Sequence, residues 1–158
     1  MPATAYFTTS ERLAALAAAG QAWLGTPFAH NGIVCGPRGG VSCHGLVVGV
    51  LAEAGWSLGE NFPTGQAGHA RHSRVEVILP WLRARPEKFA EISPVAVGAL
   101  LPGDITTHRL GLCSHHVALV LPGAWLLEVW SGRVAGVRSL VDADATKRLT
   151  GIFRPLAS

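Results

Sequence analysis

The sequence predicts an α+β fold in which N-terminal helices pack on an antiparallel sheet. Residues 11–23 are rich in alanine and residues 43–54 are mostly apolar, and both patterns are typical of helices. From residue 89 onward the chain changes to short runs, often β-branched, that proline or glycine separates. Helices followed by strands indicate an α+β protein. Because 158 residues can bury one core, we expect residues 1–158 to form a single domain.

The first helix is expected over Glu11–Trp23, after a loose lead-in of residues 1–9. Ser10 precedes the helix, and a serine hydroxyl is a good N-cap because it accepts a hydrogen bond from the first turn. Gly25-Thr26-Pro27 would end the helix. Residues 29–41 hold five glycines or prolines, so we expect a loop there.

The second helix is expected from about Cys43 to Ala54, with Gly55 ending it. Residues 57–71 form a long polar connection, which in a compact domain is usually functional or mobile. A short amphipathic helix or two broken turns should follow, since Pro80 interrupts a run of helically spaced apolar residues, Val75, Ile78, Leu79 and Leu82.

Six strands and one brief helix are expected in the second half of the chain. Pro122-Gly123 is typical of a hairpin turn between two of the strands. The brief helix covers Asp142–Leu149. The expected strands are Phe89–Ile92, Asp104–His108, His116–Leu121, Trp125–Trp130, Arg133–Leu140 and Gly151–Arg154.

Composition excludes several classes of protein. The chain is 49% apolar and 15% charged, which indicates a globular and not a disordered protein. Its net charge of +3 and pI of about 9.1 are mildly basic and suit a polyanionic partner such as a bacterial cell wall. The arginines are scattered and no nucleic-acid-binding motif is present, so we expect no nucleic acid partner.

Three cysteines leave an odd thiol, which argues against a disulfide framework and favours a reducing compartment. No apolar run reaches the length of a membrane span. Residues 13–19 resemble the core of a signal peptide, but no net positive charge precedes them. We therefore expect the chain to be cytoplasmic as synthesised and, if it acts on a cell wall, to be delivered there by something else.

Cys43 is the candidate nucleophile. It lies where a glycine-rich loop becomes a helix, and the free N–H groups and dipole of a helix N-terminus favour a thiolate there. The alternative is a small buried residue, since free cysteine is among the most buried residue types.

His116 is the candidate base. It opens an apolar strand, and alternation along that strand would send His115 to the other side. The next strand carries Glu128, which hairpin pairing would place beside His116, where a carboxylate would favour the charged imidazolium. The alternative for Glu128 is an outward-facing residue on a half-exposed strand.

Four segments in this order resemble the NlpC-type cysteine peptidases of bacterial cell-wall metabolism. They are Gly25-Thr26-Pro27-Phe28, Cys43-His44-Gly45-Leu46-Val47, Leu101-Pro102-Gly103-Asp104-Ile105 and His115-His116-Val117-Ala118. The resemblance covers about residues 13–154. Within that family, the chain most resembles the phage-associated branch, which has a histidine two residues after the aromatic residue of its first motif. Here that histidine is His30, two residues after Phe28.

The resemblance implies a papain-like fold and hydrolysis of a peptidoglycan stem-peptide amide beside a D-γ-glutamyl or diaminopimelate residue. It implies Cys43 as nucleophile, His116 as base and, twelve residues further, Glu128 as the third polar residue. We expect no cofactor and no metal. Nothing in the pattern predicts the oligomeric state.

Several positions depart from the family pattern. Ser42-Cys43-His44-Gly45 stands where the family usually has Asp-Cys-Ser-Gly, which alters the helix cap and adds an imidazole beside the thiol. Phe28 replaces a tyrosine whose hydroxyl the family places near the oxyanion, and His30 is a candidate replacement donor. We therefore count Ser42, His44, Phe28 and His30 as candidate substrate-binding or oxyanion residues.

Two other functions compete with a peptidase. Six residues are possible zinc ligands, but no paired cysteine spacing is present. They are Cys35, Cys43, His44, Cys113, His115 and His116. The departures around the thiol also fit a catalytically degenerate relative that binds cell wall without cutting it.

The remaining candidates have structural interpretations. Cys35 is incidental, Cys113 packs near a strand start, and Asp104 is a turn residue. His69 and His72 are solvated. The five tryptophans belong to the core or its rim, and they are Trp23, Trp56, Trp81, Trp125 and Trp130.

Overall fold

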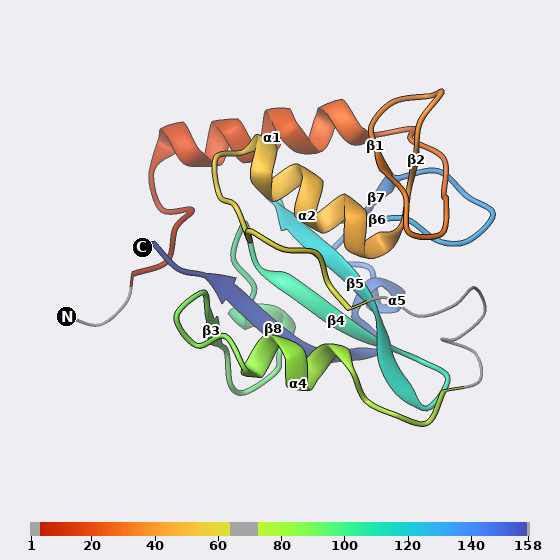
Figure 1. Cartoon of the computed structure of the whole chain (residues 1–158). Coiled ribbons are helices and arrows are strands. Elements are labelled where there is room, and N and C mark those ends of the chain that lie inside the picture. The colour runs from red at the N-terminus through yellow and green to blue at the C-terminus, as the bar shows by residue number, and fades with distance from the viewer. Residues whose placement is uncertain (1–3, 64–72, 158) are drawn as a thin grey trace.

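A six-stranded antiparallel sheet with helices on one face forms the centre of the molecule. The fold comes from a computed structural model, which describes residues 4–63 and 73–157. The order of strands across the sheet is β3-β8-β4-β5-β6-β7, and helices α1 and α2 cover one face (Figure 1). This arrangement confirms the α+β prediction. The strands are β3 (Phe89–Glu91), β4 (Ile105–Leu110), β5 (Cys113–Leu121), β6 (Trp125–Glu128), β7 (Gly136–Ser139) and β8 (Leu149–Pro155).

Helix α1 spans Ser10–Trp23 and begins one residue earlier than predicted. Thr9, not Ser10, is its N-cap, because Thr9 is the last extended residue and its hydroxyl accepts a hydrogen bond from the Arg12 N–H at 3.3 Å. The helix ends before Gly25, whose φ of 80° is a left-handed conformation that glycine adopts without strain.

Helix α2 spans Cys43–Glu53 and is apolar almost all round because it packs on both α1 and the sheet. Gly55 follows it with φ 91°, as predicted for the residue that ends this helix. The prediction of a plain loop over residues 29–41 was wrong, since β1 (Ile33–Val34) and β2 (Gly40–Val41) pair there. A Cβ on Gly39 would lie 2.1 Å from the Val34 carbonyl oxygen, so glycine allows this close approach.

Pro80 does not break the third predicted helix. Helix α4 spans Ile78–Arg83 and Pro80 lies in its first turn, where no intrahelical N–H is needed. Its apolar residues Ile78, Leu79 and Leu82 are buried against the sheet. Two short helices complete the list, η1 (Val97–Ala99) and α5 (Ala143–Thr146).

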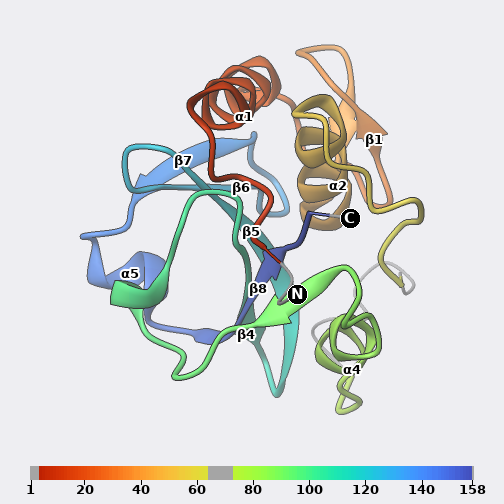
Figure 2. The ribbon, with the colours of Figure 1, turned by 90° about the vertical axis from the view of Figure 1, so that its left-hand side faces the viewer.

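The sheet separates two apolar clusters. Val117, Leu119 and Leu127 pack with the helices, whereas Ala118, Val120 and Leu126 pack on the other side with residues that include Ala145 of α5 (Figure 2). Strand β5 begins at Cys113, so the prediction that His116 opens this strand was wrong. The tight turn at Gly111 pairs Leu110 with Cys113 and lengthens the strand.

Asp104 does more than form a turn, which corrects its predicted role. Its buried carboxylate accepts hydrogen bonds from Arg154 Nε at 2.8 Å and from the Leu101 N–H at 2.8 Å. This ion pair ties β8 to the segment that enters β4.

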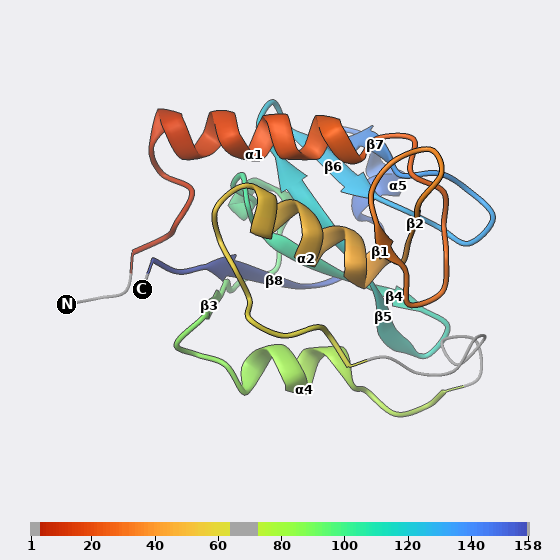
Figure 3. The same cartoon turned by 45° about the horizontal axis from the view of Figure 1, so that its top comes forward.

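The loop between β6 and β7 is joined to the segment that links α1 and β1. Gly25 N–H donates to the Ala135 carbonyl at 2.9 Å, Ala135 N–H donates to Thr26 at 2.8 Å, and Phe28 N–H donates to Arg133 at 2.9 Å. Both segments lie at the end of the molecule where α2 begins (Figure 3). None of the described helices is long and apolar enough to cross a membrane.

Candidate active site

Cys43 is the first residue of α2 and is half-buried. Ser42 caps the helix, because its hydroxyl accepts the Gly45 N–H at 3.0 Å. Within the described residues, the N–H groups of Cys43 and His44 have no hydrogen-bond acceptor. These two donors and the helix dipole therefore create a site for negative charge at the thiol.

The surroundings of Cys43 favour the thiolate form of its side chain. Burial by itself raises the pKa of this thiol. The charge of His44 and hydrogen bonds with His116 and His44 outweigh burial and hold the pKa well below its usual value. A thiolate is the reactive form of cysteine, so the sulfur is prepared for nucleophilic attack.

The imidazole of His116 lies between a sulfur and a carboxylate. Its Nε2 is 3.0 Å from Glu128 Oε2, which leaves Nδ1 for the hydrogen bond with Cys43. Burial opposes the charged ring, but the hydrogen bonds with Cys43 and Glu128 outweigh it and raise the pKa of His116. The ring also stacks on Trp130, with centroids 3.7 Å apart and planes 18° from parallel. The arrangement favours a thiolate–imidazolium pair.

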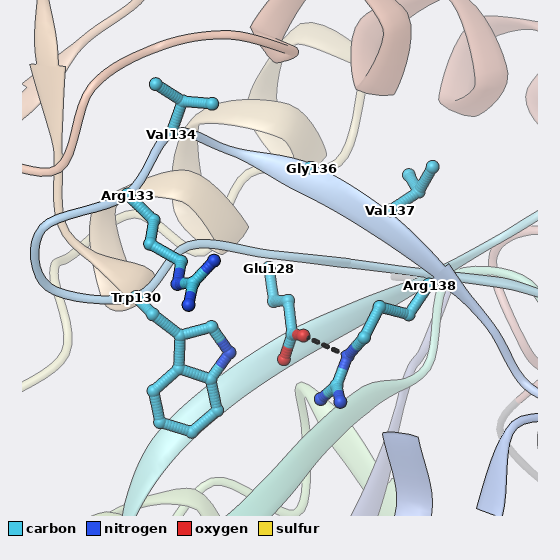
Figure 4. A pocket seen from close by; sticks show the side chains of 7 residues that line it. All are labelled: Glu128, Trp130, Arg133, Val134, Gly136, Val137 and Arg138. Carbon is cyan, nitrogen blue, oxygen red and sulfur yellow. Dashed lines mark ion pairs between the residues drawn. The ribbon is translucent and has the colours of Figure 1, made fainter. Parts of the chain in front are cut away.

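Glu128 is buried and paired, and does not face outward as the alternative interpretation had it. Arg138 Nε contacts its Oε1, and the indole of Trp130 donates toward the same carboxylate (Figure 4). Burial would raise the pKa of Glu128, but the bonds from His116 and Arg138 lower it to about 2. The carboxylate is therefore ionised throughout the neutral range.

His108 lies behind this group and stays neutral. Its ring centroid is 5.6 Å from that of His116, in the facing position on β4. Burial and the charge of His116 lower the pKa of His108 to about 4. The hydroxyl of Thr106 is 2.8 Å from His108 Nε2. A neutral ring here avoids placing a second cation beside the His116 imidazolium.

His44 adds a second imidazole at the thiol. Burial lowers its pKa, but the charge and hydrogen bond of Cys43 outweigh burial, so the pKa is raised. Its ring stacks on Phe62 with centroids 5.4 Å apart, and Phe62 in turn packs on Trp81. The sequence indicated only that a second ring stood near the thiol, and not this aromatic support.

The other predicted residues lie around the thiol or apart from it. Phe28 bridges to Val41 beside the start of α2 and offers no hydroxyl. His30 is exposed in the turn that follows Phe28. Cys113 is buried at the start of β5, and Cys35 is exposed, with its thiol 3.3 Å from the Ala22 carbonyl. His69 and His72 lie outside the described residues.

Three residues of the site were missed by sequence reasoning. Trp130 was assigned to the core or rim, and Arg138 and His108 were not singled out. No group of three or more His, Cys, Asp or Glu side chains in the described part of the chain could hold a metal ion. The zinc alternative therefore has no ligand set among residues 4–63 and 73–157.

Solved structures with the same fold include NlpC/p60 domain proteins. No protein-family model and no curated protein sequence matches the chain. One structural neighbour is a lipoprotein-like protein of the NLP/P60 family from Staphylococcus aureus, at 18% identity and a TM-score of 0.62 over the whole chain. A second is a hypothetical invasion protein of Mycobacterium tuberculosis, at 18% identity and 0.56 over 94% of the chain. A third is the NlpC/p60 domain of the peptidoglycan hydrolase SagA, at 18% identity and 0.53 over 92% of the chain.

The extent of these matches differs. The chain spans 45% of the Staphylococcus protein and 64% of the Mycobacterium protein, but 97% of the SagA domain. At these identities the likeness establishes the papain-like NlpC/p60 fold. The relation to a phage-associated branch stays a prediction.

Proposed function

We propose that the protein is a cysteine peptidase that hydrolyses amide bonds in peptidoglycan stem peptides. The observation that carries this proposal is the alignment of three groups: the Cys43 sulfur at a helix N-terminus, His116 in contact with it, and Glu128 3.0 Å behind the ring. The NlpC/p60 fold supports the substrate class, because the neighbouring SagA domain belongs to a peptidoglycan hydrolase.

The first half of the reaction transfers the acyl group to sulfur. The Cys43 thiolate attacks the scissile carbonyl carbon and forms a C–S bond, and the carbonyl oxygen becomes an oxyanion. The N–H groups of Cys43 and His44 are placed to stabilise that oxyanion. The His116 imidazolium gives its Nδ1 proton to the leaving nitrogen, the C–N bond breaks, and an amine departs.

The second half of the reaction returns the enzyme to its starting state. Neutral His116 takes a proton from water, and the resulting hydroxide equivalent attacks the thioester carbon. The C–S bond breaks, a carboxylic acid is released, and the thiolate–imidazolium pair forms again. Glu128 stays ionised throughout and stabilises the imidazolium in both halves.

We place the scissile bond beside a D-γ-glutamyl or diaminopimelate residue, as the family resemblance implies. The test is incubation of purified muropeptides with the protein, followed by mass analysis of the fragments. The fragment masses identify the bond that is cut. Cleavage should vanish in Cys43→Ala and persist in Cys35→Ala, which removes an exposed thiol. Intact muropeptides after incubation with the unaltered protein would reject a peptidase and favour the wall-binding alternative.

Our proposal retains delivery to the wall by another agent, for example a phage particle. The test is to fractionate cells that produce the protein and to detect it in the cytoplasm and in released phage particles. Its presence in the particles would support delivery by a phage.

A further inference from the structure

A pocket of about 500 Å³ lies directly behind the Glu128–His116 pair. We call it the Arg133 pocket, and it is lined by Glu128, Trp130, Arg133, Val134, Gly136, Val137 and Arg138 (Figure 4). Its volume is within the range of small-molecule sites. Glu128 and Trp130 both line the pocket and both contact His116, so its occupant would lie one side chain from the reacting atoms.

The charges in this pocket are not balanced among its own residues. Glu128 already interacts with His116 and Arg138. The guanidinium of Arg133 has no acceptor within the described residues, and it points into the pocket toward Trp130 and Glu128 (Figure 4). One cation therefore faces the pocket without a partner in the described chain.

The backbone of Arg133 is held in place although its side chain is exposed. Its N–H donates to the Trp130 carbonyl at 3.0 Å, and its carbonyl accepts from Phe28 at 2.9 Å. The adjacent Val134 forms a bridge with Pro27. A fixed backbone lowers the entropic cost of presenting the guanidinium to a ligand.

We propose that the Arg133 pocket binds one free carboxylate of the stem peptide, with the Arg133 guanidinium as its ion-pair partner. A planar guanidinium matches a carboxylate in a two-bond geometry, and one unpaired guanidinium suits a single negative charge better than a doubly charged phosphate. The indole of Trp130, which lines the pocket on the same side as Arg133, supplies apolar surface for the carbon chain that bears the carboxylate (Figure 4). This inference rests on the proposed function, because it names a recognition group on the same substrate.

The test compares two synthetic stem peptides that differ at one group. One carries the free α-carboxylate of its D-γ-glutamyl residue, and the other carries a carboxamide there. Binding is measured by calorimetry on the full chain with Cys43→Ala, so that neither peptide is cut. Arg133→Gln should weaken binding of the acid by about tenfold, the size of one lost charged hydrogen bond at a partly exposed site, and leave the amide unchanged. Arg133→Lys should recover part of the loss.

Arg148→Gln is the matched control, since it removes the same charge from an exposed residue that does not line the pocket. It should change neither affinity. Equal weakening of both peptides by Arg133→Gln, or no change in either, would overturn the carboxylate assignment while leaving hydrolysis by the unaltered protein intact. If neither peptide binds and the unaltered protein cuts neither, the proposed function fails and this inference fails with it.

Discussion

Replacing Glu128 by glutamine isolates the contribution of one negative charge to the candidate active site. The amide keeps the size of the side chain, and its oxygen can still accept the His116 Nε2–H. The substitution removes a charge 3.0 Å from the ring and leaves Arg138 unpaired beside it. The His116 imidazolium should therefore lose stability without loss of the base itself.

The size of the effect follows from the geometry. Two unit charges 3.0 Å apart attract by about 5 kcal/mol at an effective dielectric constant of about 20, as a gross value. Because a neutral hydrogen bond remains, the net loss should be closer to that of one charged hydrogen bond, about 1.5–3 kcal/mol. That is roughly a 10- to 100-fold fall in kcat/KM. Removal of the base in His116→Ala should cost roughly 100- to 10,000-fold.

The pH dependence gives a second readout with a definite sign. The active thiolate–imidazolium pair exists above the lowered pKa of Cys43 and below the raised pKa of His116. Loss of the Glu128 charge destabilises the imidazolium, so the alkaline limb of kcat/KM should move to lower pH. The acidic limb should move to higher pH, because a less stable His116 imidazolium stabilises the Cys43 thiolate less and raises its pKa. The pH range of activity should therefore become narrower at both ends.

The assay is muropeptide hydrolysis from about pH 5 to pH 10, with Glu87→Gln as the control that removes an exposed carboxylate elsewhere. A loss in Glu128→Gln as large as in His116→Ala, or an unchanged profile width, would refute the electrostatic role of Glu128.

Other changes probe the thiol and the fold. Iodoacetamide should alkylate Cys43 faster than the buried Cys113, because burial and a nearby carboxylate raise the pKa of Cys113. Equal slow labelling of both thiols would contradict an activated Cys43. His44→Ala should move the pH midpoint of Cys43 alkylation upward, because His44 is the main nearby charge that lowers this pKa, and an unmoved midpoint would count against that role. Asp104→Asn should lower the free energy of unfolding by about 3 kcal/mol in urea titrations, because Arg154 loses its buried partner, and a loss below about 1 kcal/mol would mean that the pair contributes little.

The parts of the site that the sequence predicted depend on local signals. Cys43 follows a glycine-rich turn and precedes an apolar helix, and these patterns alone located the helix start to within a residue. His116 and Glu128 belong to adjacent strands of a short hairpin, so their meeting required only one turn to be recognised.

The parts that were missed depend on the register of that hairpin. The turn contains Ala124 with φ 63° in addition to Pro122-Gly123, and Leu121 pairs with Trp125. Continued along both strands, this register sets residue 130 opposite residue 116, which explains the stack of Trp130 on His116. A left-handed alanine is not predictable from propensity, because this conformation is rare outside glycine and asparagine.

Arg138 and Asp104 were beyond sequence reasoning for a related reason. Arg138 reaches Glu128 from β7, and Asp104 meets Arg154 from a strand fifty residues later. A charged residue on a strand looks the same in sequence whether its partner is solvent or a distant side chain. The register of β6 on β7 brings Arg138 to Glu128, and the pairing of β8 with β4, which is not its neighbour in sequence, brings Arg154 to Asp104.

The backbone hydrogen bonds that join residues 25–28 to residues 133–135 have a consequence for how a ligand would meet the site. The first segment leads to Cys43, and the second bears Arg133 and follows Trp130, so backbone hydrogen bonds hold the thiol side and the Arg133 side of the site together. Any motion that separated the two segments would have to break these hydrogen bonds. If the protein is the peptidase proposed above, the entropic cost of ordering these two segments is met by the fold and not by the bound peptide.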